Sequence, residues 1–170
     1  MLIAVSGLPG SGKSFFAMKL AERLGAVYIS SDQTRKAMDA MGRYRFEDKL
    51  NVYEEMAKRA GEGLRKGQTL VVDATFYRHE MRDMFSTLCT LLHKPFFNLE
   101  IQADNETIKE RLSKPRIDSE ADFAVYQQLV REYEKPAGSQ LVIQSTNTNI
   151  EAMLGEALAY IGNINDGKGN

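Results

Sequence analysis

Short apolar segments alternate with longer amphipathic segments along most of the chain. We predict strands in the five apolar segments Leu2–Ser6, Ala26–Ser30, Thr69–Asp73, Pro95–Gln102 and Gln140–Ser145. Strands that alternate with helices usually form a parallel sheet, and helices then cover both of its faces. The pattern therefore predicts an α/β fold with a central five-stranded parallel sheet flanked by helices.

Four of the intervening segments carry apolar residues three or four positions apart, which is helical spacing. These residues are Phe16, Leu20 and Leu24 within Lys13–Leu24; Met56, Ala60 and Leu64; Met81, Met84, Phe85, Leu88 and Leu92; and Phe123, Tyr126, Leu129, Val130 and Tyr133. We predict that they form the core-facing sides of four helices. The single cysteine, Cys89, lies within the third group, so we expect a core thiol rather than a nucleophile.

The segment that follows the first predicted strand reads GLPGSGKS, at residues 7–14. This is a complete G-x-x-x-x-G-K-[ST] loop, whose glycines let backbone N–H groups converge on phosphate oxygens. Lys13 would place a positive charge on the β- and γ-phosphates, and the Ser14 hydroxyl would ligate Mg²⁺. We predict that ATP and Mg²⁺ bind here, through Gly7, Leu8, Pro9, Gly10, Ser11, Gly12, Lys13, Ser14 and Phe15.

Ligands of open parallel sheets bind beyond the carboxyl ends of the strands. The third predicted strand ends in Asp73. In nucleotide-transferring proteins a carboxylate at this position usually holds Mg²⁺ directly or through water, and we favour that role. The alternative is that Asp73 caps the next helix, and Thr75 either shares the site or is a cap itself.

Asp32 and Arg35 follow the second predicted strand and are three residues apart. If Asp32 opens a helix, both side chains can face the same cleft. The carboxylate could then accept the proton of an attacking hydroxyl, while the guanidinium could bind a phosphate of the acceptor or the moving phosphoryl group. The alternative is an aspartate cap with an ion pair to Arg35.

Arg111, Lys114 and Arg116 lie within one short segment beside a proline. We predict that this segment forms a lid whose cations neutralise the transferring phosphoryl group, with a solvated basic turn as the alternative. A second, sparser basic stretch could contact a substrate, although such stretches are more often solvated; it consists of Arg43, Arg45 and Lys49.

The length of 170 residues predicts a single domain, at residues 1–162, followed by a polar tail at residues 163–170. Residues 1–116 hold 19 Lys and Arg against 15 Asp and Glu, whereas residues 117–170 hold 3 against 8, so an anionic ligand is expected in the first part. One cysteine excludes an intrachain disulfide, and no segment reads as a signal peptide or membrane span. We expect a cytoplasmic protein without membrane contact or a disulfide-linked partner.

Taken together, GLPGSGKS, SSDQTR, VVDAT and RLSKPR…SEADFAVY resemble the small P-loop kinases of the polynucleotide 5′-hydroxyl kinase and zeta-toxin-like group, over about residues 1–134. The resemblance implies a three-layer P-loop NTPase fold with a small lid. It also implies that Asp32 is the general base, that Arg35 binds the acceptor phosphate, and that Lys13 and Ser14 contact ATP and Mg²⁺. Related kinases usually place two lid arginines four residues apart, but Arg111 and Arg116 are five apart.

The expected reaction is transfer of the γ-phosphate from ATP to an acceptor hydroxyl, with Lys13, Asp32, Arg35, Arg111 and Arg116 as the active residues. The favoured acceptor is the 5′-hydroxyl end of a nucleic acid. The alternatives are a small molecule such as a nucleoside, sugar, sugar nucleotide or antibiotic, and a non-catalytic ATP-binding module. A GTP-dependent switch would need an N/T-K-x-D guanine motif and a D-x-x-G after the third predicted strand, and neither is present.

Overall fold

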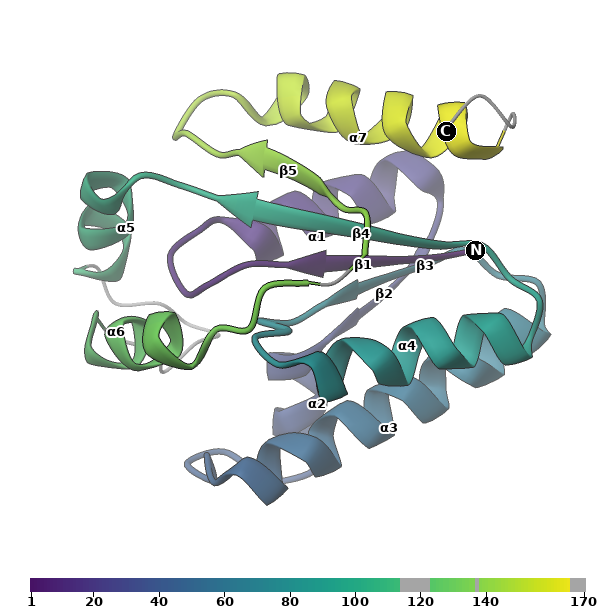
Figure 1. Cartoon of the computed structure of the whole chain (residues 1–170), viewed down its shortest axis with the longest axis horizontal. Coiled ribbons are helices and arrows are strands. Elements are labelled where there is room, and N and C mark those ends of the chain that lie inside the picture. Colours follow the sequence, from purple (N-terminus) through teal and green to yellow (C-terminus); the bar gives the residue numbers. More distant parts are fainter. Residues whose placement is uncertain (114–122, 137, 166–170) are drawn as a thin grey trace.

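The computed structural model describes residues 1–113, 123–136 and 138–165, and its described strands form one parallel sheet. The strands are β1 (Leu2–Ser6), β2 (Val27–Ser30), β3 (Leu70–Asp73), β4 (Phe96–Gln102) and β5 (Leu141–Gln144). They lie in the order β2-β3-β1-β4-β5, and every neighbouring pair is parallel. All carboxyl ends therefore meet at the same edge of the sheet (Figure 1).

Helices cover both faces of this sheet and also lie near the carboxyl ends of its strands (Figure 1). They are α1 (Lys13–Leu24), α2 (Ser31–Ala37), α3 (Phe46–Arg65), α4 (His79–Leu91), α5 (Asn105–Leu112), α6 (Phe123–Glu132) and α7 (Ile150–Asn165). Figure 1 shows α1 and α7 on one face, α3 and α4 on the other, and α5 and α6 near the carboxyl ends of the strands. None of the described helices combines the length and the apolar content that crossing a bilayer requires.

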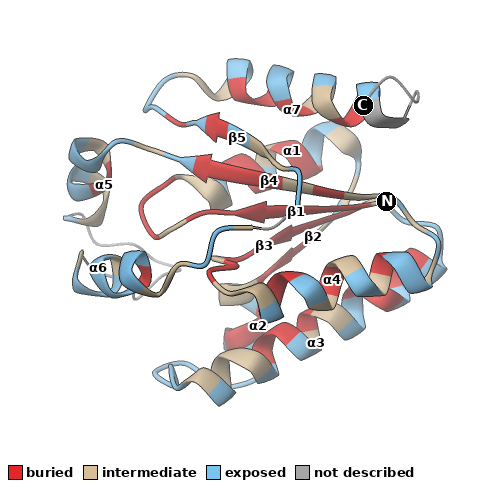
Figure 2. Cartoon of the chain, viewed as in Figure 1, coloured by how far each residue is buried: buried red, intermediate tan, exposed pale blue. Residues whose placement is uncertain are grey.

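The central strand β1 explains why the predicted strands are continuous apolar runs. Leu2 and Ala4 pack into the core beneath α3 and α4, whereas Ile3 packs into the core beneath α1 and α7. Successive side chains of a strand point to opposite faces, so a strand covered on both sides needs apolar residues at every position. Figure 2 shows β1 buried over its whole length.

The predicted α/β architecture and all five predicted strands are confirmed, with ends that differ by about one residue. For example, Ala26 is excluded from β2 because its N–H bonds to the carbonyl of Ala21 at the end of α1. At the other end of the chain, α7 continues to Asn165, so helix extends beyond residue 162, where the predicted domain ends.

The apolar stripes predicted for α1, α3 and α4 do face the core. Cys89 in α4 is confirmed as a core thiol: it is 1% exposed, and burial raises its pKa to about 11. A neutral thiol of this kind is a poor nucleophile.

The prediction of a core face is wrong for most of α6. Only Leu129 of its stripe is buried, while Val130 is 46% exposed and Tyr133 lies beyond the end of the helix. The physical reason is position: α6 lies off the carboxyl ends of the strands rather than against a face of the sheet (Figure 1). Of the predicted stripe, Leu129 lines a cavity, together with Val125 and Gln128 of the same helix.

Candidate active site

The loop between β1 and α1 holds a backbone shape that only glycine allows. Gly7, Gly10 and Gly12 have φ angles of 150°, 83° and 89°. A Cβ at Gly7 would lie 2.5 Å from the carbonyl oxygen of Ile101, and one at Gly12 would lie 2.9 Å from the hydroxyl of Ser145. The glycine positions of the motif are therefore fixed by both conformation and space.

This loop ends at the amino terminus of α1, where backbone N–H groups are available to a ligand. The helix cap is Gly12, which has no side chain to accept from them, and the first turn carries no acidic residue. The hydroxyl of Ser11 is also buried and has no hydrogen-bond partner among the described residues. Unpaired donors at a helix amino terminus form a site suited to phosphate oxygens.

Asp73 ends β3 with one carboxylate oxygen bonded and the other unpaired. The hydroxyl of Tyr28 donates to Oδ2 at 2.8 Å, and burial and the Asp73 charge raise the Tyr28 pKa. Oδ1 is buried without a hydrogen-bond partner among the described residues. The cap of α4 is Arg78, so capping of that helix is not the role of Asp73. A carboxylate oxygen in this state is the donor type that Mg²⁺ takes.

Asp32 lies in the first turn of α2, but it is not the residue that caps the helix. The cap is Ser30, whose hydroxyl accepts from the N–H of Gln33 at 3.2 Å. The alternative interpretation of Asp32 as a helix cap is therefore wrong. The sequence could not distinguish these residues, because serine and aspartate are both good caps.

Arg35 lies one turn beyond Asp32 and is held in place by its surroundings. It is 6% exposed, its Nη1 donates to the carbonyl of Arg43 at 2.6 Å, and its guanidinium lies 4.7 Å from the ring centre of Tyr44. The two contacts fix the direction of a planar group that offers several further donors. The guanidinium is thus preorganised for a ligand.

Lys13, Asp32 and Arg35 meet at one cavity of about 210 Å³ at the carboxyl ends of the strands, whereas Asp73 is not among the residues that line it. Its lining comes from five parts of the chain: Pro9 and Lys13; Ser31, Asp32 and Arg35; Tyr44, Lys49 and Tyr53; Thr75 and Tyr77; and Val125, Gln128 and Leu129. The loops after β1, β2 and β3 therefore converge as the sequence predicts.

The floor of this cavity is a strained turn whose backbone is bonded on both sides. Phe76 follows β3 with a φ of 49°, which is unfavourable for a residue other than glycine. Its N–H donates to the Tyr53 hydroxyl at 2.9 Å, and its carbonyl accepts from Nη1 of Arg82. Strain of this kind persists only where neighbours over-determine it, and here they orient Thr75 and Tyr77 toward the cavity.

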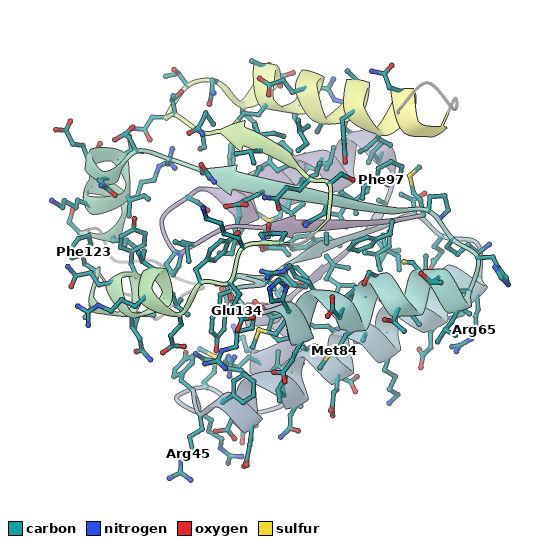
Figure 3. All side chains as sticks on the ribbon, in the orientation of Figure 1. Arg45, Arg65, Met84, Phe97, Phe123 and Glu134 are labelled. Atoms are coloured by element: carbon teal, nitrogen blue, oxygen red, sulfur yellow. The ribbon has the colours of Figure 1, made fainter. Side chains whose placement is uncertain are left out.

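Arg82 also ties the chain beyond α6 to this floor. Its Nη2 donates to the carbonyl of Glu134 at 2.6 Å, and the N–H of Glu134 donates to the carbonyl of Tyr77 at 2.8 Å. The Glu134 carboxylate in turn accepts from the N–H of His79 at 2.7 Å. Figure 3 shows Glu134 at this junction with the start of α4. One end of α6 is thus anchored to the cavity floor.

Arg111 lies against the phosphate loop and is not among the residues that line the cavity. Its Nη1 donates to the carbonyl of Gly10 at 3.1 Å, and its Nε donates to Oδ1 of Asn147 at 3.1 Å. Burial lowers its pKa. The other members of the predicted lid cluster, Lys114 and Arg116, lie outside the described residues.

The sequence placed Lys49 in a basic stretch that could contact a substrate, but it did not predict that Tyr53 of α3 or any residue of α6 lines the cavity. Lys49 is half-buried in the wall, although it belongs to a stretch that usually stays solvated. Its neighbour Arg45 does remain exposed and points away from the fold (Figure 3). Tyr53 lies three residues before Met56 on the buried side of α3, and this spacing was the available signal.

A known protein family matches most of this sequence. Residues 2–136 match the family model AAA_33, which is described as an AAA domain. The uncharacterized protein Rv2004c of Mycobacterium tuberculosis (strain ATCC 25618 / H37Rv) is 27% identical over 123 residues, which is 65% of this chain and 25% of that protein. This chain thus covers about a quarter of the length of the curated relatives it matches.

Two solved kinases share the fold over nearly the whole chain. A sugar kinase from Janibacter sp. HTCC2649, in an unliganded structure, superposes with a TM-score of 0.73 at 20% identity, over 95% of this chain and 94% of that one. The Mycobacterium tuberculosis APS kinase CysC, in complex with AMPPNP and APS, superposes with a TM-score of 0.72 at 18% identity, over 95% of this chain and 96% of that one. The likeness establishes the P-loop NTPase-like α/β fold, and the family match covers most of the sequence. The chain belongs to the AAA_33 family of AAA domains.

Proposed function

We propose that the protein is a kinase that transfers the γ-phosphate of ATP to a hydroxyl group of a small molecule. One observation carries the proposal: Lys13 of the phosphate loop lines the same cavity as Asp32 and Arg35. A donor site and an acceptor cavity that share a wall bring the reacting groups together without a covalent intermediate. Positioning of this kind accounts for much of the catalysis of phosphoryl transfer.

In this proposal the nucleotide occupies the loop from Gly7 to Ser14 and the start of α1, including Phe15. Backbone N–H groups of the loop and of the first turn of α1, together with the Lys13 ammonium, bind the phosphates. Ser14 and Asp73 would hold Mg²⁺, in agreement with the buried, unpaired Oδ1 of Asp73. When bound, this ion neutralises charge on the β- and γ-phosphates.

Asp32 accepts the proton of the acceptor hydroxyl, while Arg35 holds the acceptor in position. The acceptor oxygen then bonds to the γ-phosphorus as the bond to the β-phosphate oxygen breaks, and ADP leaves. Arg111, fixed to the carbonyl of Gly10, adds positive charge beside the phosphate loop. The apolar side of α6 excludes water that would otherwise hydrolyse ATP.

A small acceptor has more support than the nucleic-acid end that the sequence favoured. The sugar kinase and the APS kinase that share this fold are named for small molecules. The cavity has a volume of about 210 Å³ and is closed on one side by Val125, Gln128 and Leu129 of α6. A compact, partly closed cavity suits a small acceptor.

The test is transfer of labelled γ-phosphate from Mg²⁺-bound ATP to a panel of sugars, nucleosides and a 5′-hydroxyl oligonucleotide. We expect label on a small molecule, and no transfer by Lys13→Ala. The matched control Lys19→Ala lies on the same helix, in an exposed pair with Glu22, and should transfer normally. Label on the oligonucleotide alone would restore the nucleic-acid acceptor. Tight ATP binding without transfer to any hydroxyl would indicate a non-catalytic ATP-binding module.

A further inference from the structure

Positive charge gathers on one wall of the acceptor cavity. Arg35 of α2 is buried there, and Lys49 of α3 is half-buried beside it. Burial is the main cause that lowers the Lys49 pKa; the charges of Arg35 and Arg78 lower it further, while the Glu132 carboxylate opposes them. Two cations therefore share a desolvated wall in addition to the lysine of the phosphate loop.

Among the described residues, these two cations hydrogen-bond to neutral groups. The Lys49 ammonium donates to the Tyr77 hydroxyl at 3.4 Å and lies 4.9 Å from the centre of that ring. Arg35 donates to the carbonyl of Arg43. Glu132, the carboxylate that faces Lys49 from α6, lies 3.8 Å from the guanidinium of Arg78. The geometry leaves both cations directed at the cavity.

We propose that the acceptor carries an anionic group, such as a phosphate, sulfate or carboxylate, in addition to the hydroxyl that is phosphorylated. Lys49 binds this group beside Arg35, whose contact with the acceptor belongs to the proposed function, and Lys49 is a specificity-determining residue. The inference rests on the proposed function and narrows its substrate class.

The reason is the cost of desolvating charge. An acceptor that fills the cavity removes the remaining water from Lys49 and Arg35, and an unpaired buried cation is expensive. An anionic acceptor compensates with charge-assisted hydrogen bonds, whereas a neutral acceptor brings no opposite charge to either cation. Sites built in this way reject the ligand that lacks the matching group. The rings of Tyr44 and Tyr77 supply apolar contact for the remainder of the molecule.

The experiment measures calorimetric affinity for matched acceptors in protein loaded with Mg²⁺ and AMPPNP, so that the phosphate loop is filled and no transfer is needed. The pairs are gluconate with glucose, glucose 6-phosphate with glucose, and adenosine 5′-monophosphate with adenosine. We expect at least one charged member to bind more tightly than its neutral counterpart. Lys49→Met should weaken that charged member by about 10- to 100-fold and leave the neutral one unchanged, which is the scale of one charge-assisted hydrogen bond.

Two further variants separate charge from folding. Lys49→Arg should recover part of the affinity, because it restores the charge. The control Lys58→Met lies on the same helix with an exposed side chain and should bind like the wild type. Equal affinity for charged and neutral members, no binding of any charged member, or an unchanged Lys49→Met would overturn the proposal. Lys49-dependent binding without label transfer to any acceptor would instead contradict the kinase function and keep the anion site.

Discussion

Asp32 is the residue on which the proposed chemistry depends most directly. Ser30 already provides the helix cap, so Asp32→Asn can be read as a change in proton transfer rather than in capping. We expect single-turnover phosphoryl transfer to fall by about 10²- to 10⁴-fold, the usual loss for one general base. Binding of AMPPNP should be unchanged. Transfer near the wild-type rate would show that another group accepts the proton.

Tyr53 has a structural role at the same site. It is buried, and burial raises its pKa to about 12, so the hydroxyl stays protonated. This hydroxyl shares a hydrogen bond with the hydroxyl of Thr75 and accepts from the N–H of Phe76. Tyr53→Phe leaves that N–H unpaired, and we expect the free energy of unfolding to fall by about 1–3 kcal/mol. Urea denaturation measures the loss. Tyr160→Phe is the control, and an equal effect in both variants would contradict this role.

At the scale of elements, hydrophobic periodicity predicts which side of a helix or strand is apolar, but not what that side packs against. The strands were predictable because burial on both faces demands apolar residues at every position. The stripe of α6 has the same period as those of α3 and α4, yet its Leu129 lines a cavity and its Val130 is exposed. Periodicity alone cannot distinguish a helix against a sheet from a helix over a site.

Helix α5, which carries Arg111, should show a pH-dependent cap. Asp104 accepts from the N–H and hydroxyl of Thr107, and these bonds lower its pKa. A lowered pKa means that the carboxylate stabilises the folded state above its unfolded pKa of about 3.9, and that this contribution is lost as pH falls through the folded pKa. Asp104→Ala should therefore be less stable than the wild type at neutral pH.

Urea denaturation across the acid range checks this prediction. The difference in the free energy of unfolding between Asp104→Ala and the wild type should narrow as the pH falls, because the wild type loses its ionised cap. Asp83→Ala, on the exposed side of α4, serves as the control and should show no such narrowing. If this difference in the free energy of unfolding stays constant or grows in acid, Asp104 does not cap α5 as a carboxylate.

At the scale of the whole molecule, topology made part of the site predictable. The loops after parallel strands must meet at one edge of the sheet, so Lys13, Asp32 and Thr75 could be grouped from the sequence. Tyr53 and Leu129 could not be added to this group, because they reach the cavity through the packing of α3 and α6, which no local pattern encodes. The sequence therefore predicted the nucleotide side of the site better than the acceptor side.

The phosphate loop also connects elements that are distant in the chain, so nucleotide binding should stabilise the whole fold. Gly7 lies against the carbonyl of Ile101 in β4, and Gly10 accepts from Arg111 of α5. A ligand present at 100 times its dissociation constant adds about 2.7 kcal/mol to stability if it binds only the folded state. For a chain of this size that corresponds to a rise in Tm of roughly 5–10 °C.

We expect this rise when Mg²⁺ and AMPPNP are added to the wild type at saturating concentration, measured by differential scanning calorimetry. Lys13→Ala should lose most of it at the same ligand concentration, because the variant lacks the cation that binds the β- and γ-phosphates. Lys19→Ala, exposed on the same helix, should keep the full rise, since surface pairs of this kind contribute little. A rise in Lys13→Ala equal to that of the wild type would mean that nucleotide is held elsewhere, and the phosphate loop would then no longer support the kinase proposal.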